Sequence, residues 1–330
     1  MIGLALMALM MTKAQAAARG AAWAMAHWYT SVAPVLFPFL ALMPLLTSRE
    51  AGTAYERLLG RVMEKLFRLP GPAASAMVVG MIAGAPAGAI ASRDVAARSG
   101  MNRGQLNRLA VAASGFSPAF LVGGIGEGML GSVALGWRLL EAQLLTQMTL
   151  ALVLRWAWRD RDRPVAVVPE MTEEGFIRGA VVTVLTICGY MALFGALAQV
   201  FGEYLGQGPS NIILCLLDVP SGARLVAGSA MMEEIRMPVL SAMCGFGGIC
   251  VVAQSLGALK GCGVSAAEFV SMRMLAGIIS ACYMAVLMKM SEGGMGRLAS
   301  MVWGKPLELA AMIAALLAIP AIMALRKTVS

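Results

Sequence analysis

Ionisable side chains inside apolar stretches are the first candidates for chemistry in this chain. Asp218 and Arg224 lie on either side of a Pro-Ser-Gly break, and Glu127 lies in the glycine-rich run GGIGEGML. Ionisable residues at membrane depth usually line a pathway or pair with one another. Asp218 and Arg224 can form an ion pair, or Arg224 can hold an anionic solute through two parallel hydrogen bonds. Glu127 is interpreted either as a coupling or gating carboxylate or as a helix cap at the membrane edge.

Breaks in the apolar segments are the second kind of candidate. They occur at GAPAGAI, GFSPAFLVGG, DVPSGAR and GFGGICVVAQ. Non-helical backbone at membrane depth survives only when it is buried or lines a cavity, so the breaks are predicted to gather around one solute site. The backbone amides and helix N-termini at the breaks can bind carboxylate groups. The alternative interpretation is that the glycines only allow close helix packing. The predicted substrate-binding residues are Gly84, Pro86, Gly88, Ser114, Gly115, Ser117, Asp218, Pro220, Ser221, Gly222, Arg224, Gly245, Gly247 and Gln254.

The composition of the chain is that of a membrane protein. Of its 330 residues 59% are hydrophobic and 13% are charged, and the mean hydropathy is +0.77. Apolar stretches near the roughly 20 residues that a spanning helix needs recur along the chain. Because only helices satisfy their backbone in lipid at this length, the predicted fold is an all-α polytopic membrane protein with about eight spans and two re-entrant hairpins. The first run, MIGLALMALMM, lacks a preceding basic residue and is interpreted as a short membrane helix, with a signal peptide cleaved after AQA (Ala14 to Ala16) as the alternative.

Charge, cysteine and histidine usage exclude several classes of site. The formal net charge is +8, but most Lys and Arg residues lie in short loops, which indicates topology signals and anionic-lipid contacts rather than nucleic-acid binding. The six cysteines form no C-x-x-C pair, and His27 is the only histidine. We therefore expect no metal, no cofactor and no enzymatic activity. The expected partners are the lipid bilayer and a small anionic solute. A homo-oligomer is also considered.

The chain aligns with itself in several places. GAPAGAI meets DVPSGAR at a shift of 134 residues (218 − 84), and GFSPAFLVGG meets GFGGICVVAQ at a shift of 130 (245 − 115). Apolar helices precede and follow the motifs in both copies, which indicates a duplication. The predicted organisation is an N-terminal helix and interfacial segment at 1–30, a first repeat at 31–157, a charged linker at 158–175, a second repeat at 176–289 and a C-terminal helix within 290–330.

Loop charges predict that the two repeats are inverted. Arginines lie on both sides of Ala73 to Ala91, so both ends of this stretch are expected in the cytoplasm. A single span would place the ends on opposite sides of the membrane. The stretch is therefore predicted to form a re-entrant hairpin with its tip at GAPAG. Few basic residues flank Asn211 to Gly228, which suits a hairpin that enters from outside. Inverted repeats with broken helices are typical of secondary transporters. Residues 57–68 are predicted to form an amphipathic helix on the cytoplasmic interface.

Several motifs resemble one known family. GFGGICVVAQSLGALKGCGVSAAEFVSMRML, LLDVPSGA, GMIAGAPAGA and LFPFLALMPLL are similar to the YlbJ sporulation membrane proteins, whose halves carry nucleoside-recognition (Gate) domains. The resemblance covers nearly the whole chain. It implies a multi-pass protein of the bacterial cell membrane that exports dipicolinic acid from the mother cell across the outer forespore membrane. Two alternatives are a membrane scaffold in spore envelope assembly and a transporter of nucleoside-like solutes.

The chain also departs from the family pattern at the first hairpin and the second break. Ala85 and Ile90 stand where the family usually has an aromatic residue and a lysine, and Val252 stands where it often has a histidine. Arg224 keeps a basic residue in the second copy. These departures concern the identity of the substrate more than the fold.

Overall fold

The computed structural model describes residues 2–46, 49–157, 176–205 and 207–292, and within these ranges the chain forms helices and no strand. The prediction of an all-α fold is therefore confirmed for the described part of the chain. The predicted linker at 158–175 and the predicted last helix, at 307–325, lie outside the described residues.

Within the described ranges, three helices are long and apolar enough to cross a membrane. They are Ile177–Leu205 within α10 (Phe176–Leu205), Glu233–Ala258, and Ala266–Met290 within α15 (Ala266–Glu292). Other apolar segments form shorter helices, so the predicted number of about eight spans stays a prediction.

The outward faces of the long helices are apolar. Val182 on α10 is 55% exposed and Ile278 on α15 is 64% exposed. Large exposed apolar faces are rare on soluble monomers and are expected where lipid covers the surface. Length, composition and exposed faces together make this an integral membrane protein.

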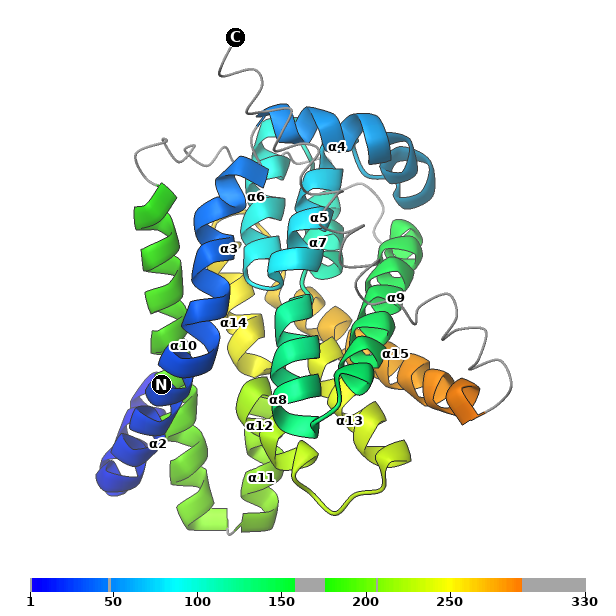
Figure 1. The fold of residues 1–330 in the computed structure, drawn as a ribbon. Coiled ribbons are helices and arrows are strands. Elements are labelled where there is room, and N and C mark those ends of the chain that lie inside the picture. Colours follow the sequence, from blue (N-terminus) through cyan, green and yellow to red (C-terminus); the bar gives the residue numbers. More distant parts are fainter. Residues whose placement is uncertain (1, 47–48, 158–175, 206, 293–330) are drawn as a thin grey trace.

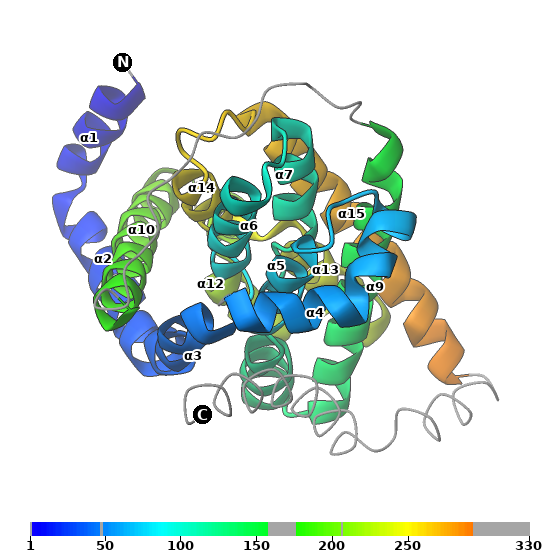
Figure 2. The same ribbon diagram turned by 90° about the horizontal axis from the view of Figure 1, so that it is seen from above.

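The N-terminal region forms a short helix, a break at Lys13 and then a long helix beside α10 (Figures 1 and 2). Its segments are α1 (Ile2–Thr12), α2 (Ala14–His27), the π-helical turn η1 (Trp28–Val32) and α3 (Ala33–Leu46). Residues on both sides of η1 keep helical dihedrals, so α2, η1 and α3 are continuous and the predicted boundary after residue 30 falls inside this helix. Gly20 allows close packing on α10, because a Cβ there would lie 2.3 Å from the carbonyl oxygen of Gly195.

A surface helix lies across the upper end of the bundle in Figure 1. It consists of α4 (Arg49–Val62) and the π-helical turn η2 (Met63–Phe67). The helix buries Tyr55 and Met63 and exposes Arg57. This one-sided burial matches the amphipathic helix that the sequence predicts over 57–68.

The first half contains a helical hairpin, a broken helix and a long helix. In chain order these are α5 (Ala73–Ala83), α6 (Ala87–Ser99), α7 (Arg103–Ala112), the π-helix η3 (Ala119–Glu127), α8 (Gly128–Leu130) and α9 (Val133–Ala157). Gly80 on α5 and Gly88 on α6 seat the hairpin against the end of α7. A Cβ on either glycine would lie about 2 Å from the carbonyl oxygen of Ala113, at 2.1 and 2.0 Å respectively.

The second half has the same order of elements. They are α11 (Gln207–Leu217), α12 (Val219–Ala227), α13 (Glu233–Phe246), α14 (Gly248–Ala258) and α15. Gly222 on α12 closes the hairpin, because a Cβ there would lie 2.5 Å from the Cα atom of Cys215 on α11. Gly247, with φ of +93°, separates α13 from α14. In Figure 1 the α5–α6 hairpin occupies the upper part of the bundle and the α11–α12 hairpin the lower part.

Candidate functional site

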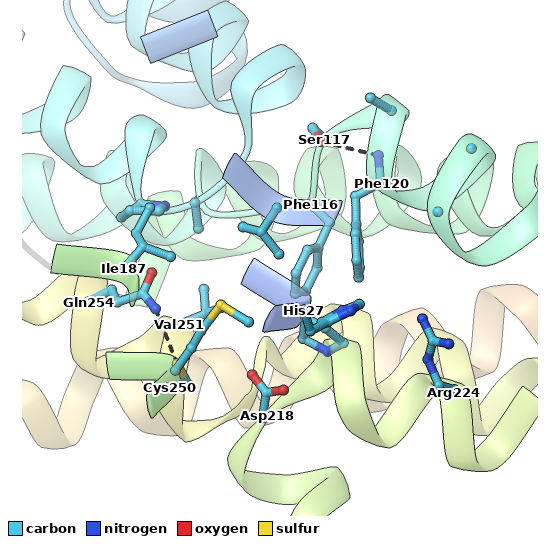
Figure 3. A pocket seen from close by; sticks show the side chains of 18 of the residues that line it. His27, Phe116, Ser117, Phe120, Ile187, Asp218, Arg224, Cys250, Val251 and Gln254 are labelled. Carbon is cyan, nitrogen blue, oxygen red and sulfur yellow. Dashed lines mark hydrogen bonds between the residues drawn. The ribbon is translucent and has the colours of Figure 1, made fainter. Parts of the chain in front are cut away.

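The hairpin tips and the helix breaks meet at a pocket of about 350 Å³ (Figure 3). This volume lies within the range of small-molecule sites. Residues from both halves line it, together with residues of α2 and α10. The predicted site residues among its lining are Pro86, Ser117, Asp218, Pro220, Arg224 and Gln254.

Part of the pocket wall comes from outside the two predicted motifs of each half. His27 of α2 is buried and lines the pocket, as do Ile187 and Met191 of α10. The rings of Phe116 and Phe120 stack at 4.9 Å between centroids and form an apolar surface opposite these helices. The sequence analysis missed His27 as a lining residue because it placed residues 1–30 outside the repeats.

Arg224 is the free cation of the pocket. In the described part of the chain it makes no hydrogen bond or ion pair, so the Asp218–Arg224 ion pair considered from the sequence is not formed there. Figure 3 shows Arg224 and Gln254 at opposite ends of the pocket, with Asp218 and His27 between them in this view. Gln254 donates from Nε2 to Sγ of Cys250 at 3.1 Å. The pocket therefore has a cationic end and an amide end.

Asp218 is held by the first turn of α12. Its carboxylate is 4% exposed, and Oδ2 accepts hydrogen bonds from the backbone N–H of Ser221 at 3.1 Å and from the Ser221 hydroxyl. This is the geometry of an N-cap, and Pro220 fits beside it because the first residues of a helix need no backbone donor. The helix N-terminus and Ser221 thus supply the hydrogen-bond donors of the Asp218 carboxyl group.

The backbone amides at the hairpin tips have partners within the protein. The N–H of Ala85 donates to the carbonyl oxygen of Gly115 at 2.6 Å, and that of Ser221 donates to Asp218. Gly84 makes the first contact possible, because its φ is +77° and a Cβ there would lie 2.8 Å from the Ser117 nitrogen. At Ala85 and Ser221 the structure therefore differs from the expectation of free amides. A solute would meet side chains such as Arg224 at these points.

The other predicted residues lie behind the pocket or away from it. Ser114 donates from its hydroxyl to the carbonyl oxygen of Ala110 at 2.6 Å. Gly245 packs against α15, where a Cβ would lie 2.7 Å from the Ala276 oxygen. Glu127 is exposed at the end of η3 and does not line the pocket. The residues at the breaks that do not line the pocket are Gly84, Gly88, Ser114, Gly115, Ser221, Gly222, Gly245 and Gly247.

One buried arginine that the sequence analysis missed joins the two broken helices. Arg273 on α15 is 3% exposed, donates from Nε to the carbonyl oxygen of Phe246 at 3.0 Å and donates from Nη1 to that of Ser114. Phe246 is the last residue of α13 and Ser114 lies just beyond α7, so both carbonyls are at helix C-terminal ends, where the helix dipole favours a cation. Arg273 could have been identified from the sequence, because it is a charged residue inside an apolar span.

Two glutamines of α9 occupy the corresponding place in the first half. Gln143 accepts from the Phe116 N–H at 2.8 Å through Oε1 and donates to the Phe116 oxygen at 2.6 Å through Nε2. Gln147 lies one turn later and is also buried, with no hydrogen-bond partner for either amide atom among the described residues. Glutamines four positions apart on an apolar helix share one face, which was the available signal.

The described residues offer no metal centre. No group of three or more His, Cys, Asp or Glu side chains within the described ranges is placed to hold a metal ion. All six cysteines are free thiols, and Cys250 lines the pocket. The polar side chains that line the pocket are those of His27, Ser117, Asp218, Arg224 and Gln254, beside the rings of Phe116 and Phe120.

Comparison with known proteins gives one relative. No family model matches the chain, and no solved structure matches it. The chain is 24% identical to the sporulation integral membrane protein YlbJ of Bacillus subtilis (strain 168), over 86% of this chain and 80% of that protein. Similarity along this much of both chains supports assigning the protein to the YlbJ-type family of integral membrane proteins.

Proposed function

We propose that this protein carries a small anionic solute across a bacterial membrane, as a transporter or facilitator and not as an enzyme. The observation that carries the proposal is the pocket at the helix breaks, with the unpartnered guanidinium of Arg224 at one end. A guanidinium group matches a carboxylate through two parallel hydrogen bonds. A binding site at helix breaks between two related halves is the arrangement that transporters use.

The proposal includes an inverted relation between the two halves. Its support is the shared order of hairpin, broken helix and long helix, and the position of the two hairpins at opposite ends of the bundle in Figure 1. Pro86 and Pro220, one from each hairpin tip, line the same pocket. Each half would then close one side of the pocket in turn, and solute would cross without an open channel.

Dipicolinate is the first substrate to test. Its support is the family resemblance and the name of the relative, which connects that protein with sporulation. Dipicolinate is a small planar dianion, so one carboxylate can pair with Arg224 while the ring lies against Phe116. The proposed location is accordingly the outer forespore membrane. A neutral nucleoside-like solute gains less from Arg224, so the two candidates can be separated by variants at this residue.

The test is uptake of labelled dipicolinate by the purified protein in proteoliposomes. Replacing Arg224 by Gln removes a charge-assisted hydrogen bond and is expected to lower uptake at limiting concentration by about tenfold or more. Arg224→Lys keeps the positive charge but not the two parallel donors of a guanidinium group, so its uptake should lie between those of the wild type and Arg224→Gln. Lys289→Gln is the matched control, since it removes a cation at the exposed end of α15.

Each outcome decides between the candidates. Absence of dipicolinate uptake by well-folded protein would remove this substrate, and nucleoside uptake would then favour the second class of solute. Absence of both would leave the scaffold role in spore envelope assembly. Uptake that is equal in wild type and Arg224→Gln would place the binding site elsewhere.

A further inference from the structure

A second cavity adjoins the pocket. It has a volume of about 740 Å³ and lies between α6, α10 and α14, which are neighbours in the view from above (Figure 2). Pro86, Ile187 and Gln254 line both cavities. The two cavities therefore adjoin at these three residues, which form the wall between them.

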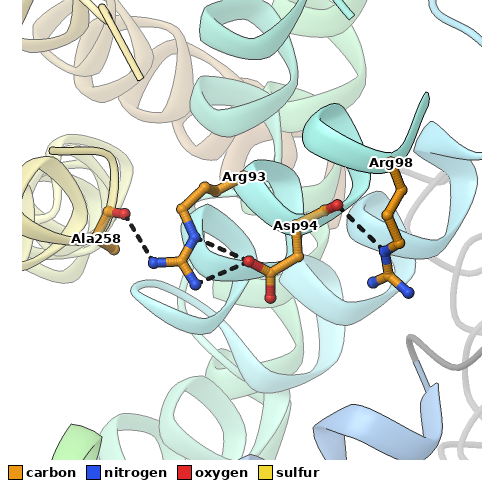
Figure 4. Close-up of polar contacts among 4 residues, drawn as sticks. All are labelled: Arg93, Asp94, Arg98 and Ala258. Carbon is orange, nitrogen blue, oxygen red and sulfur yellow. Dashed lines mark hydrogen bonds and ion pairs between the residues drawn. The ribbon is translucent and has the colours of Figure 1, made fainter. Parts of the chain in front are cut away.

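The lining of the second cavity is basic. Arg93, Arg178 and Lys260 line it, and among the described residues no Asp or Glu does. Arg93 is engaged, because its guanidinium pairs with Asp94 at 2.8 Å and donates to the carbonyl oxygen of Ala258 at 3.3 Å (Figure 4). It thereby ties α6 to the end of α14 and fixes one wall. The exposed cations Arg178 and Lys260 have no ion-pair partner in the described part of the chain, so they supply the net positive charge of the lining.

We propose that this second cavity, the basic vestibule, is an access site that attracts small carboxylates before they reach the pocket. The inference rests on the proposed function and extends it with a second site. A concave surface of one sign of charge concentrates counter-ions and raises association rates. Arg178 and Lys260 would set that rate, whereas Arg224 would set how long the solute stays.

The vestibule also indicates which side of the membrane is open. Arg178 lies in the first turn of α10, at the end of the bundle where α4 lies across the helices in Figure 1. Arg57 of α4 belongs to the basic segment that the sequence analysis places in the cytoplasm. The topology predicted from the loop charges thus places the vestibule on the cytoplasmic side, where an exporter takes up its solute.

The experiment measures binding of dipicolinate to the protein in nanodiscs of zwitterionic lipid, where both faces are accessible. In Arg178→Gln/Lys260→Gln the association rate is expected to fall about three- to tenfold while the dissociation rate changes less than twofold. The effect should shrink at high ionic strength and be smaller for the monoanion picolinate. Arg57→Gln/Arg61→Gln is the control, because it removes the same charge from the exposed face of α4 outside the cavity.

The outcomes separate this inference from the function on which it rests. No binding by folded wild type removes the proposed function and the vestibule with it. Wild-type binding with equal association rates in the two double variants overturns the vestibule alone. An effect of Arg178→Gln/Lys260→Gln that appears only with anionic lipid also overturns it, since the cations would then serve lipid headgroups. Thermal unfolding of both double variants at the wild-type temperature excludes misfolding.

Discussion

The two broken helices are held by different side chains at matching positions. Gln143 binds the backbone of Phe116, and Arg273 binds that of Phe246. The two backbone positions and the two side chains that hold them are the same number of residues apart, since 246 − 116 and 273 − 143 both equal 130. The bonds of Gln143 stay within the first half, whereas Arg273 also reaches Ser114 of the other half. The second half therefore supplies the link between the two breaks.

The chemistry of the two side chains explains the difference. A glutamine amide has a donor and an acceptor, so Gln143 satisfies the N–H and the C=O of one residue. Arginine only donates, so Arg273 requires carbonyl oxygens. Burying its charge costs several kcal/mol, and the C-terminal ends of two helices offset that cost. Such a residue suits only the place where both breaks converge.

The largest expected effect is at this link. Arg273→Leu leaves the carbonyls of Ser114 and Phe246 without their donor and separates the breaks, so we expect a loss of about 3–5 kcal/mol in unfolding free energy. Arg273→Gln keeps one donor and should lose about half as much. Chemical unfolding in micelles measures both. If Arg273→Leu lowers the unfolding free energy no more than Gln143→Leu does, the link between the two halves adds no stability beyond that of a contact within one half.

Gln143→Leu is expected to cost about 2–3 kcal/mol, because both backbone groups of the half-buried Phe116 lose their partner. Gln143→Glu tests the acceptor and donor separately, since a carboxylate can only accept. The same unfolding assay applies. Wild-type stability of Gln143→Leu would indicate that the first break is held by packing alone.

The hairpins come next, through their glycines. Gly88→Ala should cost about 2 kcal/mol, because the added Cβ would lie 2.0 Å from a backbone oxygen. Gly222→Ala meets the Cys215 Cα at 2.5 Å and should cost somewhat less. Gly123→Ala is the control, with no atom within 4 Å of its Cβ. Equal melting temperatures for the three variants would contradict tight seating of the hairpins.

The smallest effect is expected at the tip of the second hairpin. Asp218→Ala removes the cap of α12 and should cost about 1 kcal/mol, whereas Asp218→Asn keeps an acceptor and should change stability by only a few tenths. The first hairpin has Gly84 at the matching position and no such cap. A large loss in Asp218→Asn would mean that the charge itself, rather than the cap, stabilises the tip.

The sequence predicts the breaks well because glycine and proline act locally. Gly84, Pro118 and Gly247 all lie where helices end or begin, as their backbone preferences require. Side-chain contacts between the halves are harder to predict. Arg273 and Ser114 are 159 positions apart, and no local pattern specifies that bond. His27 reaches the pocket because α2 packs on α10, which is also a tertiary effect.

The central claim is that one pocket between the halves binds a small dicarboxylate, and equilibrium binding of labelled dipicolinate to the purified protein tests it most directly. The expected result is saturable binding of one molecule per chain that Arg224→Gln weakens by about tenfold and Lys289→Gln leaves unchanged. Folded protein that shows no saturable binding, or binding that Arg224→Gln leaves intact, would contradict the claim.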